Sequence, residues 1–238
     1  MPFVCNFDNI DTSYDDLFNN RLDLPWLPWV GKRFSQTDKK TMILGESTYN
    51  WDPGNEEVAK RISKSDHLRI IHQNHALNYN RSSGFVRNIE KAIFYMKAPT
   101  VLEKKLLWSS VVYHNLVLRA MRIIDDRPKY NDYLTGWKVF IDMSTLINIE
   151  QCIVYGLERN KIDSLIETLK AGQIFYNYRK LKVKIGKSYP RIVDIHLEDK
   201  QVKLIFIRHP SSYFSWEKWG GILRNEFQLP RQVELASP

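Results

Sequence analysis

Short apolar runs alternate along the chain with longer stretches in which apolar residues recur at helical spacing. Runs of nearly continuous apolar character, as expected of strands buried on both faces of a parallel sheet, occupy residues 41–45, 110–118, 152–156 and 202–207. Residues 132–149 carry apolar side chains three and four positions apart, which predicts a long amphipathic helix. The order of these elements predicts a single α/β domain over residues 1–238, with helices on both sides of a central, mostly parallel four-stranded sheet.

Other segments complete this pattern. Helices are predicted for residues 56–64, 82–97 and 162–171. Residues 192–197 can pair with residues 202–207 as a hairpin.

Two regions outside the predicted parallel strands also have a clear character. Residues 180–185 alternate basic and apolar side chains, which predicts a half-exposed strand whose basic face carries Lys182 and Lys184. Residues 1–40 are expected to form an N-terminal arm followed by a loop rich in proline and tryptophan at residues 24–31, packed against the body of the domain.

Composition narrows the class of protein. The 238 residues include 35 Lys and Arg against 27 Asp and Glu, a net charge of +8. This charge suits a polyanionic partner such as DNA, although many basic proteins bind no nucleic acid. No apolar run could span a membrane, and the first residues lack the features of a signal peptide, so we expect a soluble, cytoplasmic monomer.

Cysteine and histidine place limits on cofactors. Cys5 and Cys152 are too few for an iron–sulfur cluster or a disulfide framework, and we expect both to be buried. His67, His72 and His75 lie close together, but no carboxylate or cysteine stands at a useful spacing for a metal. We therefore expect no metal and no other cofactor.

Polar residues follow two of the predicted strands. Gly-Glu-Ser-Thr-Tyr-Asn occupies residues 45–50, and His-Pro-Ser-Ser-Tyr occupies residues 209–213. Pro210 cannot continue a strand, so His209 should lie at the strand's carboxyl end, and Ser211 or Ser212 can cap a helix carrying Trp216. In open α/β sheets ligands bind at this edge.

These two motifs resemble the signature motifs of the uracil-DNA glycosylase superfamily, in the right order and near the two ends of the chain. The resemblance covers most of the chain in architecture but only about a dozen residues in motif. It implies a monofunctional DNA glycosylase that flips a base out of single- or double-stranded DNA and hydrolyses its N-glycosidic bond.

The resemblance also implies roles for the residues of the first motif. Glu46 is the candidate carboxylate, because Gly45-Glu46 is similar to the start of this motif in the iron–sulfur branches; the alternative is that Glu46 pairs with a nearby base. Ser47 stands where other branches have aspartate or asparagine, so it can orient water but cannot offset positive charge. Gly45, Tyr49 and Asn50 would border the base, with Tyr49 excluding bulky 5-substituents.

Outside the first motif, His209 matches the histidine that donates a hydrogen bond to the departing base. Asn115 resembles the asparagine that reads a pyrimidine edge, and Phe85 is the candidate for stacking on the base; a turn asparagine and a core phenylalanine are the alternatives. Tyr213 stands in the place of the residue that fills the gap left by the flipped nucleotide. Contacts to DNA phosphates are expected from Arg208, Ser211, Ser212, Lys182 and Lys184.

The departures from the usual motif leave two other functions open. The chain could act on a modified or hypermodified base, such as those of phage DNA, in a defence role. It could also be a nucleic-acid-binding protein that kept the fold and lost catalysis, since Ser47 replaces a carboxylate or amide.

Overall fold

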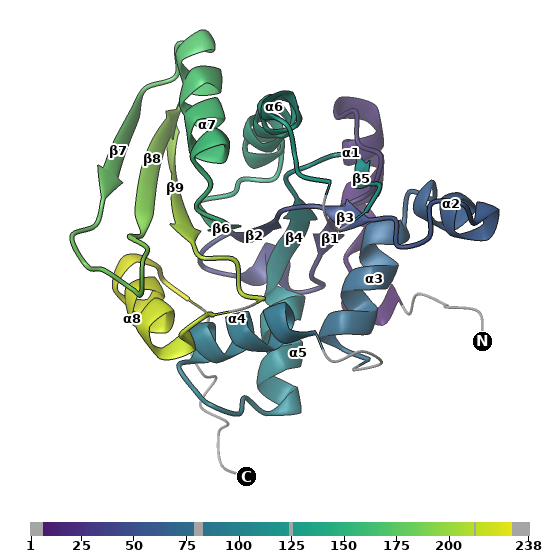
Figure 1. Ribbon diagram of the computed structural model, residues 1–238, viewed down its shortest axis with the longest axis horizontal. Coiled ribbons are helices and arrows are strands. Elements are labelled where there is room, and N and C mark those ends of the chain that lie inside the picture. Colours follow the sequence, from purple (N-terminus) through teal and green to yellow (C-terminus); the bar gives the residue numbers. More distant parts are fainter. Residues whose placement is uncertain (1–6, 79–82, 124–125, 212, 230–238) are drawn as a thin grey trace.

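The computed structural model describes residues 7–78, 83–123, 126–211 and 213–229. The described residues form an α/β protein built on one mixed sheet of seven strands, in the order β1-β4-β2-β6-β9-β8-β7 (Figure 1). The prediction of a four-stranded sheet therefore underestimates the number of strands. Four neighbouring strands are parallel, as predicted, and they form the middle of the sheet: β4 (Val111–Asn115), β2 (Thr41–Gly45), β6 (Gln151–Tyr155) and β9 (Lys200–Ile207).

Three antiparallel strands extend this parallel core. On one side, β8 (Arg191–Leu197) pairs with β9 as the predicted hairpin, and β7 (Tyr176–Lys180) pairs with β8. On the other side, the short strand β1 (Trp29–Val30) pairs with β4. A separate two-stranded sheet joins β3 (Thr48–Tyr49) to β5 (Ala120–Met121).

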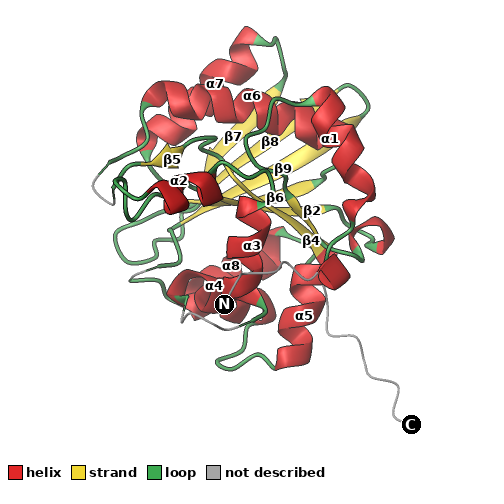
Figure 2. Cartoon of the chain, turned by 90° about the vertical axis from the view of Figure 1, so that its right-hand side faces the viewer, coloured by secondary structure: helices red, strands yellow, loops and turns green. Residues whose placement is uncertain are grey.

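Helices cover both faces of the main sheet (Figure 2). One face is covered by α6 (Tyr130–Leu146), α7 (Arg159–Ala171) and α1 (Asp15–Arg21). The other is covered by α3 (His67–Ala76), α4 (Gly84–Phe94), α5 (Val101–Ser110) and α8 (Trp216–Glu226). The small helix α2 (Glu56–Ile62) lies at the side.

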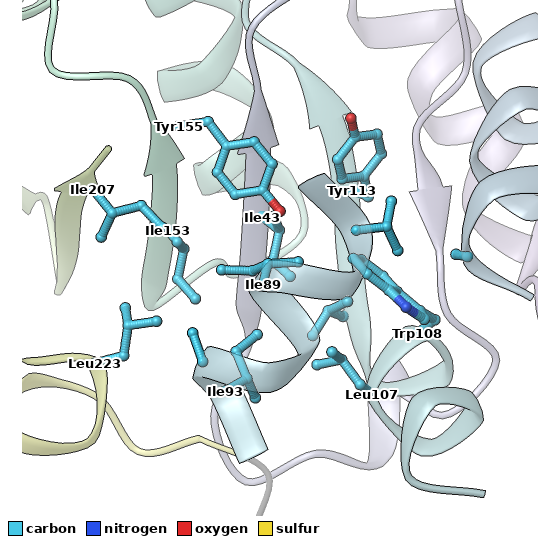
Figure 3. Packing of buried hydrophobic residues seen from close by; sticks show 14 of the residues in the cluster. Ile43, Ile89, Ile93, Leu107, Trp108, Tyr113, Ile153, Tyr155, Ile207 and Leu223 are labelled. Atoms are coloured by element: carbon cyan, nitrogen blue, oxygen red, sulfur yellow. The ribbon is translucent and has the colours of Figure 1, made fainter. Parts of the chain in front are cut away.

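Two buried clusters of apolar side chains, one on each face, account for this packing. On the α4 face, the rings of Tyr113 and Tyr155 border the aliphatic residues Ile43, Ile89 and Ile153 (Figure 3). Adjacent residues of each parallel strand point to opposite faces, and both faces are buried. The continuous apolar runs of the sequence follow from this burial.

The predicted strand at residues 180–185 is wrong. β7 ends at Lys180, which is paired with Arg191 at the start of β8. Pro190 precedes β8 and has no N–H to offer, so the ladder stops after the bond from the Leu181 N–H to the Pro190 carbonyl. Residues 181–190 form a loop in which Ile185 is buried.

The helix cap proposed after the second motif also differs. The residue before α8 is Ser215, not Ser211, and its side chain makes no capping hydrogen bond. Ser212, the other candidate cap, lies outside the described residues.

From residue 7 onward, the N-terminal region packs on the domain, and the end of the predicted loop at residues 24–31 is the strand β1. The indole N–H of Trp26 donates to the Ile62 carbonyl and that of Trp29 to the Trp108 carbonyl. Cys152 is buried as expected, while Cys5 lies outside the described residues. No helix in the described ranges is long and apolar enough to cross a membrane.

Candidate active site

The two motifs meet at the carboxyl edge of the parallel strands. Glu46 follows β2 directly, Asn115 is the last residue of β4, and His209 stands two residues beyond β9. Because these strands are parallel and belong to one ladder, their ends share one edge of the sheet. The carboxylate of Glu46 and the ring of His209 are near enough for each to shift the pKa of the other.

Glu46 is held by residues of the two helices on one face of the sheet. Its Oε1 accepts hydrogen bonds from Nζ of Lys161 at 2.7 Å and from the hydroxyl of Tyr133 at 3.1 Å. Burial raises the pKa of Glu46, but Lys161, His209 and Tyr133 together outweigh burial, and the pKa is lowered overall. Glu46 is therefore a carboxylate at neutral pH, and its pairing with a base, left open by the sequence, is present.

His209 is oriented by its own loop. The backbone N–H of Ser211 donates to Nδ1 at 3.2 Å, and the Ser211 hydroxyl lies 3.0 Å from the same atom. Since a backbone N–H can only donate, Nδ1 is an acceptor, and the proton of the neutral ring is on Nε2. Burial lowers the pKa of His209 more than Glu46 raises it. The ring thus presents a neutral Nε2–H donor.

Aromatic rings and α4 surround His209. Its ring lies 5.6 Å from that of Tyr155 and 6.2 Å from that of Phe85, measured between centroids. The side chain of Asn88 in α4 donates to the Pro210 carbonyl at 2.7 Å, which ties the second motif to this helix. Phe85 is half-buried and also packs against the core, so the structure brings it to His209 while keeping the packing role open.

Asn115 is buried and has hydrogen-bond partners within the protein. Its Nδ2 donates to the Thr48 hydroxyl at 3.0 Å, and its Oδ1 accepts from the Tyr113 hydroxyl at 3.2 Å. Gly45 makes this possible, because a Cβ there would lie 2.5 Å from Oδ1 of Asn115. Among the described residues, one N–H and one lone pair of the amide have no hydrogen-bond partner.

Other residues of the first motif have different surroundings. The hydroxyl oxygen of Ser47 is buried and makes no hydrogen bond within the described residues. The ring of Tyr49 lies 5.5 Å from that of Trp51 and packs on the α6 and α7 side of the core. Asn50 accepts the amide N–H of Asp52 and lines a pocket of about 440 Å³. None of the described contacts joins Tyr49 or Asn50 to His209.

The candidates for DNA contact lie around the same edge. Arg208 packs over the ring of Tyr213 at 5.8 Å, and Tyr213 is 90% exposed. Lys182 and Lys184 are exposed in the loop after β7. Lys180 is paired with Arg191, which is in turn paired with Phe206, so this loop leaves the sheet at the edge that carries His209. Ser212 lies outside the described residues.

The sequence did not single out Lys161, Tyr133 or Glu158. Nζ of Lys161 also donates to the Tyr155 carbonyl at 2.6 Å and to Glu158 at 2.8 Å. The helix was predicted to begin at residue 162, but α7 begins at Arg159, which places Lys161 one turn before the buried Leu165. The available signal was this spacing of four positions, since a lysine on the buried side of a helix needs a partner.

A groove of about 1240 Å³ lies at the opposite edge of the sheet, where the parallel strands begin. Its lining includes Lys39, Phe94 and Arg224 and none of the motif residues. The charged and aromatic groups described above, and not this groove, define the candidate active site. No protein-family model and no curated protein sequence matches this chain.

Proposed function

We propose that this chain is a monofunctional DNA glycosylase that hydrolyses the N-glycosidic bond of uracil or another altered base. The fold that the resemblance implies is a uracil-DNA glycosylase-like sandwich of helices on both sides of a parallel core. The observation that carries the proposal is the meeting of Glu46 and His209, from opposite ends of the chain, at one edge of the sheet.

The chemistry of the two side chains suits base removal. Hydrolysis needs a hydrogen-bond donor for the charge that develops on the departing base and a negative group for the charge on the sugar. The neutral Nε2–H of His209 can supply the first, and the carboxylate of Glu46 the second. Ser47, whose hydroxyl has no described partner, can hold the attacking water.

The surroundings supply candidates for binding the flipped nucleotide. Phe85 can stack on the base beside His209, and the remaining N–H and lone pair of Asn115 can read its edge. The exposed ring of Tyr213 can fill the gap in the duplex. Arg208, Ser211, Lys182 and Lys184 would contact phosphates.

The test is release of free bases from DNA, followed by mass spectrometry. The substrates should include oligonucleotides with uracil and other altered bases, together with modified phage DNA. We expect release by the wild-type chain and a loss of about 100-fold or more in His209→Ala and Glu46→Gln, with DNA binding retained. The exposed residues His196 and Glu57 provide matched controls, His196→Ala and Glu57→Gln, which should release bases normally.

The panel separates this proposal from its rivals. Release from modified phage DNA alone would assign the enzyme to a hypermodified base and a defence role. DNA binding without release from any substrate would leave a nucleic-acid-binding protein, a function favoured by Ser47 and by the internal hydrogen bonds of Asn115. Equal release by the His209 and Glu46 variants and the wild type would exclude this site as the catalytic one.

A further inference from the structure

Lys161 is buried next to Glu46, and its ammonium donates three hydrogen bonds. Its side chain is 0% exposed, and Nζ donates to Glu46, Glu158 and the Tyr155 carbonyl. An ammonium has three N–H donors, so none remains for a substrate. Lys161 can act on the site through its partners but cannot itself attack a nucleotide.

The two oxygens of Glu46 differ in their surroundings. Lys161 and Tyr133 both donate to Oε1. Oε2 has no hydrogen-bond partner within the described residues. The arrangement therefore fixes the carboxyl group by one oxygen and leaves the other for water or substrate.

We propose that Lys161 is a positioning residue whose ion pair with Glu46 anchors Oε1, so that Oε2 is the oxygen that acts in base removal. This inference rests on the proposed function. Lys161 also holds Glu158, so the two carboxylates and one ammonium carry a net charge of −1, which favours positive charge on a sugar.

The charge state of Glu46 depends on groups from several elements. Lys161 belongs to α7, Tyr133 to α6, and His209 to the loop after β9. Glu158, the residue before α7, accepts a hydrogen bond from the same Lys161 ammonium. Burial alone would raise the pKa of Glu46, and the interaction with Lys161 is the largest of those that lower it. Without Lys161 we expect burial to prevail and the pKa to rise.

Gly156 makes room for this cluster at the end of β6. Its φ of +99° is in the left-handed region that favours glycine. A Cβ at this position would collide with Oε2 of Glu158 and with Nζ of Lys161. Gly156 thus offers a second way to disturb the cluster without changing any of its charged groups.

The main experiment compares Lys161→Met with Lys170→Met, which removes an exposed lysine from the same helix. Base release is measured as a function of pH, and the pKa of Glu46 is followed by NMR of labelled carboxyl carbons. For Lys161→Met we expect burial to raise the pKa of Glu46 past neutrality, so that most of the carboxyl group is protonated at pH 7. The rate should then fall at least about tenfold at pH 7 and partly recover at higher pH. Lys170→Met should match the wild type.

A purely structural role for Lys161 predicts a different result. The rate would then fall by the same factor at every pH, and the titration of Glu46 would not move, which would overturn the proposal. The NMR titration needs no substrate, so a wild-type chain that releases no base would contradict the proposed function while still showing whether Lys161 controls Glu46.

If Lys161→Met does not fold, Gly156→Ala is compared with Gly186→Ala. Gly186 also has a positive φ, of +61°, but has nothing within 4 Å of the added Cβ, so it reports backbone strain alone. We expect Gly156→Ala to raise the pKa of Glu46 and shift the rate profile to higher pH, with no such shift in Gly186→Ala. The same titration in both alanine variants would overturn the proposal.

Discussion

Glu46, which is partly buried, and Glu90, which is fully buried, each lie beside a basic side chain, yet their pKa values are shifted in opposite directions. Glu46 accepts hydrogen bonds from both Lys161 and Tyr133, and its pKa is lowered. Glu90 in α4 accepts one from the Trp108 indole, and burial raises its pKa to about 7. Burial alone therefore does not determine the pKa of a carboxyl group. Hydrogen-bond donors and cations aligned with the carboxylate can outweigh burial and lower the pKa.

The geometry of the Glu90 pair explains the difference. Oε2 of Glu90 lies 2.9 Å from Nη1 of Arg87 but accepts no hydrogen bond within the described residues. Glu90 is completely buried, in the layer formed by α3, α4 and α5. A poorly aligned ion pair recovers less of the desolvation free energy than the aligned donors of Glu46. We therefore interpret Glu90 as a packing group and Glu46 as a group kept charged for chemistry.

The largest expected effect comes from removing the cation beside Glu46. Lys161→Met leaves the largely buried Glu46 carboxylate without its main partner, so the free energy of unfolding should fall by about 4 kcal/mol at pH 7. Adding Glu46→Gln should restore part of this loss, because the uncompensated charge is then gone. Urea unfolding of the two single variants and the double variant measures the coupling. Additive losses would mean that the two side chains are not paired in solution.

A second prediction concerns the pH dependence of stability. The folded pKa of Glu90 is about 7, above the ordinary 4.5, so the folded state binds more protons than the unfolded state between these values. Glu90 therefore makes its full contribution to the free energy of unfolding below pH 4.5. This contribution declines by about 3 kcal/mol as the pH rises to 7. Glu90→Gln should remove this decline in urea unfolding measured between pH 4.5 and 8.

Glu46 should show the opposite behaviour. The pKa of Glu46 is lowered in the folded state, so Glu46 contributes to the free energy of unfolding above pH 4.5. This contribution is lost as the pH falls through the folded pKa. Glu46→Gln should therefore flatten the acid side of the stability curve, while the exposed variant Glu57→Gln leaves both sides unchanged. An unaltered curve for Glu90→Gln would mean that Glu90 is already ionised by its partners.

The same contrast shows what the sequence could predict. The parallel strands and their helices follow from apolar runs and helical spacing, and the two motifs mark the strand ends where Glu46 and His209 meet. The strand β1 and the end of β7 depend on pairing between distant segments, which local patterns do not contain. Lys161 was missed for the same reason, since its partner Glu46 follows β2, 115 residues away in the sequence.

The smallest effect is expected from removing the second hydrogen-bond donor to Glu46, the hydroxyl of Tyr133. Tyr133→Phe removes a hydroxyl that donates to Oε1 but leaves Lys161 in place, so the loss of stability should be about 1 kcal/mol at pH 7. The pKa of Glu46 should rise less than in Lys161→Met, because Tyr133 makes the smaller contribution to its lowering.

Tyr130 provides the matched control for this variant. It lies on the same helix, and its hydroxyl donates to Glu167 at the surface, so Tyr130→Phe removes the same kind of hydrogen bond where water can replace it. Urea unfolding and NMR titration of both variants should therefore show an effect for Tyr133→Phe alone. If Tyr133→Phe and Tyr130→Phe have the same free energy of unfolding and the same pKa of Glu46, Lys161 by itself accounts for the charge of Glu46. The difference between Glu46 and Glu90 is then due to the aligned ammonium of Lys161 alone.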